Sequence, residues 1–266
     1  MKATRGLLAL AALVAVVPGC AALTEVIGKP KLRAVRLKIT GIDLQGVGLS
    51  FDVDVENPYF VPIRAPLVRY GLDIAGAEFL RSEAPLKVDL PADNIGTLTV
   101  PVHLSYSKLW SAYRSLKGAR EVDYTLRGAL GLRVLGQSFD LPLSHSGKFP
   151  VLRVPRFSDV RFHLSDVSLR KAKITVDALV TNPNVFEIGI DGLGYVLKVG
   201  DVQLGGLSAA TAGTIGSDQS GRLTLTGEVS AVGALLQLLK GGRAGKASLV
   251  PSGSIKTPYG AARLQD

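Results

Sequence analysis

The chain has 266 residues, of which 47% are hydrophobic, and it carries a formal net charge of +9. This composition excludes a disordered chain, which lacks the apolar residues needed to form a core, and the length is sufficient for two domains of ordinary size. The single cysteine, Cys20, excludes an intrachain disulfide and any cysteine-based zinc or iron–sulfur site.

The first nineteen residues are typical of a bacterial lipoprotein signal peptide. A short basic start is followed by an uninterrupted apolar run, Leu7 to Val17. This run is too short for a membrane-spanning helix, which needs roughly 20 residues, and suits the core of a signal peptide. The segment Val17-Pro18-Gly19-Cys20 resembles a lipobox. We therefore expect removal of residues 1–19, lipidation of Cys20, and an anchor linker over residues 20–31.

The lipobox resemblance also predicts a location. Ala21 and Ala22, rather than aspartate, follow the cysteine, which by resemblance to sorted lipoproteins points to the outer membrane, facing the periplasm. The expected partner is then the membrane, reached through Cys20, and a basic protein held there meets anionic lipid rather than nucleic acid. The alternative is a secretory signal cut elsewhere, with Cys20 incidental.

The rest of the chain contains one pattern twice. Asn57-Pro58 and Asn182-Pro183 each end an alternating apolar run, and they lie 125 residues apart. The same offset relates Ile63 to Ile188, Tyr70 to Tyr195, Leu72 to Leu197 and Gly128 to Gly253. A constant offset of this length predicts two duplicated domains, over residues 32–150 and 151–266. The short joint Val151–Pro155, with one proline and no glycine, predicts limited swing between them.

Within each copy, period-two alternation predicts strands with one buried face. The clearest runs are Leu49–Val55, Leu98–Tyr106 and Val122–Leu130 in the first copy, and Ile174–Val180 and Leu223–Val229 in the second. Proline cannot donate to a β-ladder, so each Asn-Pro pair should end its strand, and the asparagine amide should bond backbone groups in the turn.

Two segments in equivalent places have helical periodicity, Lys108–Lys117 and Val232–Lys240. In the first, Trp110 and Tyr113 lie on or beside the apolar stripe. They are either core residues or an apolar contact patch for lipid or another ligand. Many short strands with one helix per copy predict a mainly β protein made of antiparallel sandwiches.

The residues around the asparagine turns resemble the water stress and hypersensitive response (WHy) domain of late-embryogenesis-abundant type 2 proteins. The signature is Asn182-Pro183-Asn184, and the first copy has Asn57-Pro58 with Tyr59 where asparagine is usual. The resemblance covers about residues 32–148 and 155–264. It implies two tandem fibronectin/immunoglobulin-like β-sandwiches that protect proteins or membranes during water stress, without catalytic residues.

The search for chemistry returns no strong motif. His103, His145 and His163 have no metal-ligand spacing. Asp52, Asp54 and Glu56 form an acidic row that in principle suits calcium, but alternate strand positions usually form a solvated face. Gly241–Ala247 resembles a phosphate-binding loop, but the spacing between its glycines is one residue too short. Ala247 also stands where serine or threonine would bind magnesium. We expect no catalytic residue, no metal, no cofactor and no enzyme.

The sequence leaves two functional hypotheses. The first is a non-enzymatic, membrane-anchored lipoprotein that protects envelope proteins or membranes under desiccation, with stress-destabilised proteins or anionic lipid as partners. The alternative is an envelope adaptor or lipid-binding module that uses a groove in or between the sandwiches. The aromatic pair Trp110 and Tyr113 and the apolar Val232–Leu239 segment motivate the alternative.

Overall fold

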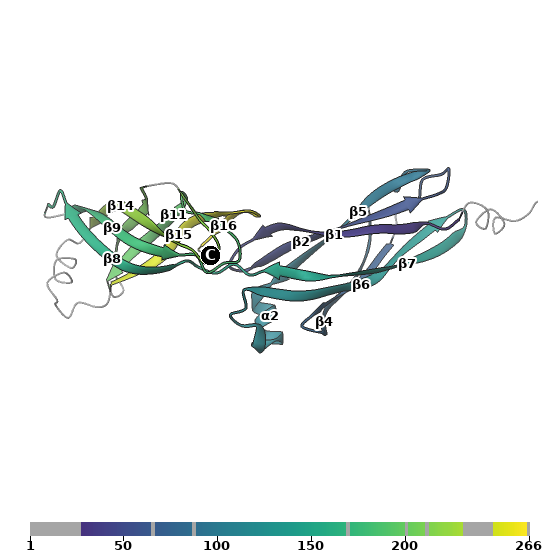
Figure 1. Ribbon diagram of the computed structural model, residues 1–266, viewed down its shortest axis with the longest axis horizontal. Coiled ribbons are helices and arrows are strands. Elements are labelled where there is room, and N and C mark those ends of the chain that lie inside the picture. The colour runs from purple at the N-terminus through teal and green to yellow at the C-terminus, as the bar shows by residue number, and fades with distance from the viewer. Residues whose placement is uncertain are drawn as a thin grey trace, which may run out of the picture.

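The computed structural model describes residues 28–64, 67–86, 89–168, 171–199, 202–210, 213–230 and 247–264. These residues form antiparallel strands almost throughout, as the alternating pattern predicts. The strands fall into two groups along the chain, which we call the first unit (residues 31–150) and the second unit (residues 156–264). Figure 1 shows the two units end to end, joined by the segment between β7 and β8.

The first unit is a sandwich of two sheets, one of three strands in the order β1-β2-β5 and one of four in the order β4-β3-β6-β7. Apolar side chains from both sheets meet between them; the rings of Phe51 on β2 and Tyr124 on β6, for example, lie 5.6 Å apart. The strands are β1 Lys31–Ile42, β2 Gly46–Asn57, β3 Leu67–Ile74, β4 Ala77–Pro85, β5 Asn94–Ser105, β6 Glu121–Val134 and β7 Gln137–Pro150.

The second unit forms one continuous nine-stranded sheet, because β12 pairs with β14 through Ser208–Thr226 and Ala209–Leu225. The strand order is β13-β10-β15-β11-β12-β14-β9-β8, and β16 pairs with β15. The strands are β8 Arg156–Ser165, β9 Lys171–Thr181, β10 Ile188–Gly189, β11 Leu193–Val199, β12 Val202–Ala209, β13 Thr214–Ile215, β14 Ser220–Ser230, β15 Ala247–Thr257 and β16 Gly260–Arg263.

The offset of 125 residues is preserved in space. The isolated bridge between Ile63 and Leu90 in the first unit becomes the β10–β13 pair Ile188–Ile215 in the second. The pairing of β2 with β5 becomes that of β9 with β14. The duplicated sequence therefore folds into duplicated strand pairs.

The predicted helix of the first unit is shifted. Lys108–Lys117 was expected, but the helix α2 spans Tyr106–Ala112, and a 3₁₀ turn, η1, follows at Arg114–Leu116. The break lies at Tyr113, whose backbone is non-helical and whose ring packs 6.2 Å from Phe79 on β4. The helix predicted over Val232–Lys240 and the residue Cys20 lie outside the described residues.

Buried apolar side chains and a backbone hydrogen bond stabilise the joint between the units. Val151, Leu152 and Pro155 are buried. The amide of Val151 donates to the carbonyl of Arg120 at 2.8 Å. Limited swing between the units stays a prediction, and burial of these apolar side chains is consistent with it.

Candidate functional site

The signature asparagine of the second unit is a buried clamp. Asn182 follows the last residue of β9, and its side chain has no exposed surface. Its Nδ2 donates to the carbonyls of Phe186 (2.7 Å), Gly216 (3.0 Å) and Ile215 (3.1 Å). Pro183 directs the chain out of the strand, and the amide then holds the returning turn against β13.

The first unit has the same clamp. Asn57 ends β2, and its Nδ2 donates to the carbonyls of Pro91 (2.8 Å) and Val61 (2.9 Å), with Leu90 more distant at 3.5 Å. Pro58 follows it as Pro183 follows Asn182. Each acceptor is the exact counterpart, 125 residues earlier, of an acceptor of Asn182. A buried amide that satisfies several backbone carbonyls is an element of folding, so the Asn-Pro signature marks how the module closes.

The third residue of the signature differs between the units. Asn184 is buried and bonds back to Asn182, with its amide N at 3.0 Å and its Nδ2 at 2.9 Å from the Asn182 Oδ1. Tyr59 is also fully buried, but it turns its ring to 6.3 Å from that of Phe139 on β7. The signature position therefore fills the core in one unit and forms polar contacts in the other.

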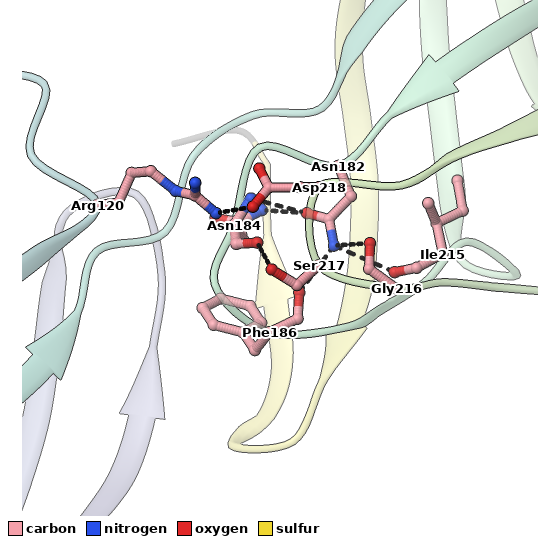
Figure 2. A network of polar contacts seen from close by, with 8 residues as sticks. All are labelled: Arg120, Asn182, Asn184, Phe186, Ile215, Gly216, Ser217 and Asp218. Atoms are coloured by element: carbon pink, nitrogen blue, oxygen red, sulfur yellow. Dashed lines mark hydrogen bonds and ion pairs between the residues drawn. The ribbon is translucent and has the colours of Figure 1, made fainter.

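These polar contacts reach the joint. Oδ1 of Asn184 accepts from the amide of Arg153 at 2.7 Å, and its Nδ2 donates to the carbonyl of the same residue at 3.0 Å. Arg120 of the first unit forms an ion pair with Asp218 of the second at 2.8 Å. Figure 2 shows Arg120, Asp218 and the two asparagines gathered at this point. Asn184, which is bonded to Asn182, thus also positions the chain segment that precedes the second unit.

Trp110 and Tyr113 have different neighbours in the structure. Trp110 is half-buried and stacks on Tyr106 at 5.7 Å, one turn earlier on α2. The hydroxyl of Tyr113 instead donates to the carbonyl of Ala77 at 3.2 Å, within the first unit. The two aromatic side chains therefore have different contacts.

Trp110 lines a groove between the units. Two adjoining hollows of about 640 Å³ and 500 Å³ share Gln45, in the turn between β1 and β2. The second unit contributes Ala261 and Arg263 to one hollow and Leu264 to the other. We call these two hollows the interdomain groove. Trp110, a predicted site residue, thus lines one of these hollows.

The acidic row on β2 is neutralised by basic residues on β1. Arg33 pairs with Glu56, Arg36 with Asp54 and Lys38 with Asp52. The hydrogen bond from Lys38 lowers the pKa of Asp52, and that from Arg36 lowers the pKa of Asp54. We call these three pairs the charge ladder. Because each carboxylate faces a cation, the row does not offer calcium a free oxygen set.

The histidines are dispersed. His103 lines the interdomain groove, His145 lies 2.9 Å from the hydroxyl of Tyr124, and His163 lies 3.5 Å from Asp177. Within the described ranges, no three acidic, histidine or cysteine residues cluster in a way that could hold a metal. The same residues contain no helix that is long and apolar enough to cross a membrane.

Comparison with known proteins finds relatives of both units. The family model of the late embryogenesis abundant proteins matches residues 52–147 and 177–260, one segment in each unit. The "Probable desiccation-related protein LEA14" of Arabidopsis thaliana is 27% identical over 135 residues, which are 50% of this chain and 87% of that protein. One relative of this length therefore corresponds to about one unit.

Solved structures are similar to parts of the chain. A solution structure of an Arabidopsis thaliana protein has 27% identity and a TM-score of 0.38 over 50% of this chain and 87% of its own. A crystal structure of a protein from Archaeoglobus fulgidus has 13% identity and a TM-score of 0.38 over 47% of this chain and all of its own. The family model, in contrast, matches more than half of the residues, in both units. The chain therefore belongs to the late embryogenesis abundant protein family.

Proposed function

We propose that this chain is a non-enzymatic lipoprotein of the WHy type that protects envelope proteins or membranes when water is withdrawn. The observation that carries the proposal is the family match in both units, together with similarity to a protein described as desiccation-related. The lipobox around Cys20 supports attachment to the outer membrane. A protein held there faces the periplasm, which drying and osmotic stress affect.

The two outer sheet faces of the first unit support this function physically. The charge ladder covers one outer face of the first unit with paired charges. The outer face of the opposite sheet carries Arg69–Asp140, Arg81–Glu78 and Arg127–Asp73. Such a surface stays hydrated and offers little apolar area for association. A protein of this kind can separate partly unfolded proteins without itself aggregating.

The direct test uses the mature chain, residues 20–266, with Cys20→Ser so that no lipid is present. A drying-sensitive enzyme is dried with this protein or with an equal mass of albumin, and the recovered activity is measured. We expect clearly greater recovery than with albumin. Recovery equal to that with albumin contradicts protection of proteins, and leakage of dried vesicles then tests protection of membranes.

The anchor is tested separately. Radiolabelled palmitate should enter the wild-type protein in a host with the lipoprotein pathway, and it should be absent from Cys20→Ala. Label that persists in Cys20→Ala contradicts lipidation at this residue. A deletion strain that survives drying and hyperosmotic shock as well as its parent contradicts the physiological role.

The interdomain groove favours a second candidate function, binding of an apolar ligand. Trp110 is the single tryptophan of the chain, so its fluorescence reports on the groove directly. If the groove binds acyl chains, a fatty acid should shift this emission to shorter wavelength, and native mass spectrometry should show the bound species. Tyr113→Ser is the matched control for Trp110→Ser in the mass measurement, because Tyr113 is not among the residues that line the groove.

A further inference from the structure

Large exposed apolar side chains gather at one end of the first unit. Phe60 is 66% exposed and Ile95 is 52% exposed. Phe60 lies in the turn that follows the Asn57 clamp, and Ile95 pairs with Glu56 near the start of β5. The amide of Asp93 donates to the carbonyl of Tyr59 at 2.8 Å and ties the two segments together. We call residues 57–63 and 91–95 the free end of the first unit.

The duplication shows that this exposure is specific to the first unit. The counterpart of Phe60 is Val185, which is partly buried against the core. The counterpart of Ile95 is Ser220, whose hydroxyl lies 2.8 Å from that of Thr181. In the second unit this end of the module faces the joint, through Asn184 and Arg153. The module therefore presents this end to whatever precedes it in the chain.

In the first unit the preceding segment is the one that leads back to Cys20. The chain enters β1 at Lys31, which pairs with Glu56 beside the free end. Figure 1 shows β6 and β7 turning at this same end, away from the second unit. Lys31 lies eleven positions after Cys20, and an extended chain covers at most about 3.6 Å per residue, or about 40 Å in all. A lipid on Cys20 would therefore keep the free end close to the bilayer.

The charges at the free end favour an anionic surface. Lys29, Lys31 and Arg64 are exposed around it. Of the acids, Glu56 is paired with Arg33, while Asp93 is exposed. Exposed aromatic and aliphatic side chains surrounded by cations are the combination that binds the interface of an anionic membrane.

We propose that the free end of the first unit is a membrane-docking surface, in which Phe60 and Ile95 enter the interface of an anionic bilayer and Lys29, Lys31 and Arg64 contact its headgroups. The proposal rests on the proposed anchor at Cys20 for its place in the cell. It gives the protein an orientation, with the first unit on the membrane and the second unit projecting from it.

The test measures binding of the lipid-free chain, residues 20–266 with Cys20→Ser, to vesicles that contain phosphatidylglycerol and phosphatidylethanolamine. We expect measurable binding that weakens as salt is added. The double substitution Phe60→Ser and Ile95→Ser should weaken it at least about tenfold, since each removes a large apolar side chain from the interface. Both residues are exposed, so the fold should be preserved, and a thermal melt verifies this.

Val167→Ser provides the matched control. Val167 is 53% exposed, but it lies in the turn after β8, at the end of the second unit remote from the joint. This variant should bind as the parent does. Equal binding by the Phe60/Ile95 variant, equal loss in Val167→Ser, or no binding by the parent overturns the docking surface.

These outcomes are independent of the proposed function. Vesicle binding by the lipid-free chain does not require lipidation, and the palmitate experiment with Cys20→Ala tests the anchor alone. Enzyme protection during drying is measured without membranes. Failure of the docking surface would thus leave the protective role intact, and failure of the protective role would leave the docking surface measurable.

Discussion

The two units have the same clamp but close their sheets differently. In the first unit, the described strands form two separate sheets. In the second, pairing of β12 with β14 joins the equivalent sheets into one. Because both units derive from one pattern, the differences between them identify the residues that decide how the sandwich closes.

Glycine accounts for the joined sheet. A Cβ at Gly227 on β14 would lie 2.2 Å from the carbonyl oxygen of Gly206 on β12, and a Cβ at Gly205 would lie 2.3 Å from that of Glu228. At the positions of Gly205 and Gly227, the first unit has Leu80 and Val102. Side chains of this size hold β4 and β5 apart, whereas glycine lets the backbones approach closely enough to pair.

The largest predicted effect concerns the feature that the units share. Asn182→Ala removes a buried amide and leaves three carbonyls without their donor, so we expect a loss of about 3–5 kcal/mol in the free energy of unfolding. Denaturant unfolding measures this. Asn57→Ala should cost about 1 kcal/mol less, because the only partner found for the Asn57 Oδ1 within the described residues is the amide of Tyr59. Asn182→Asp is the isosteric control.

The control separates shape from hydrogen bonding. A carboxylate at residue 182 still accepts from Asn184, but it turns an oxygen toward three carbonyl oxygens. It should destabilise at neutral pH at least as much as alanine does. If Asn182→Asp were as stable as the parent, the clamp would be a packing feature and the donor would be unimportant.

The second prediction tests the difference in sheet closure. Gly227→Val should break the β12–β14 pairing and lower the free energy of unfolding by about 2–4 kcal/mol, because the added side chain overlaps the backbone of β12. Hydrogen exchange at Ser208 and Ala209 should accelerate. Gly206→Ala is the matched control, since a Cβ there meets nothing within 4 Å, and its effect should stay within about 0.5 kcal/mol.

A third prediction addresses the joint. Asn184→Tyr gives the second unit the residue of the first unit and removes both bonds to Arg153. We expect a loss of about 1–3 kcal/mol and a wider distribution of angles between the units, measured by small-angle scattering. Arg120→Ala breaks only an exposed ion pair with Asp218 and should cost at most about 1 kcal/mol. Identical scattering from Asn184→Tyr and the parent contradicts a role for the clamp in holding the joint.

The sequence predicted the strands with faultless alternation and the ends set by proline. Val53 and Val55 lead to Asn57, where β2 stops, and Val180 leads to Asn182 just past β9. It missed β7, because His145 and Gly147 interrupt the inward apolar face of that strand. Alternation reports burial of a continuous face, and this edge strand lacks one.

Specific side-chain contacts, which periodicity does not describe, account for the remaining differences. The stacking of Tyr106 on Trp110 begins α2 earlier than periodicity indicated, and the contact of Tyr113 with β4 ends it earlier. The bonds between Asn184 and Arg153 join residues 31 positions apart. The glycines at 205 and 227 were visible in the sequence, but their effect depends on which strands face one another, and a periodic pattern does not contain that information.

The smallest predicted effect concerns acid stability, for which the units also differ. In the first unit the charge ladder lowers the pKa values of Asp52 and Asp54. In the second, the counterpart of Asp52 is Asp177, which faces His163 at 3.5 Å, and the counterpart of Asp54 is Leu179. There a hydrogen bond from Lys256 lowers the pKa of one carboxyl, Asp191. A carboxylate whose pKa is lower in the folded than in the unfolded chain stabilises the fold at pH values above its unfolded-state pKa, about 3.9. This stabilisation is lost as the pH falls through its folded-state pKa.

Trp110 lies in the first unit, so its fluorescence reports the melting of that unit. Between pH 6 and pH 3 we expect the melting temperature of the first unit to fall by a few degrees more than that of the second unit. Melting of the second unit is measured by hydrogen exchange. The double substitution Asp52→Asn and Asp54→Asn should reduce this difference, because the titrating groups are gone while the hydrogen-bonding shape remains. If the double variant kept the full pH response, the stabilisation would come from carboxylates outside the charge ladder, and the ladder would serve mainly to keep this face of the first unit hydrated.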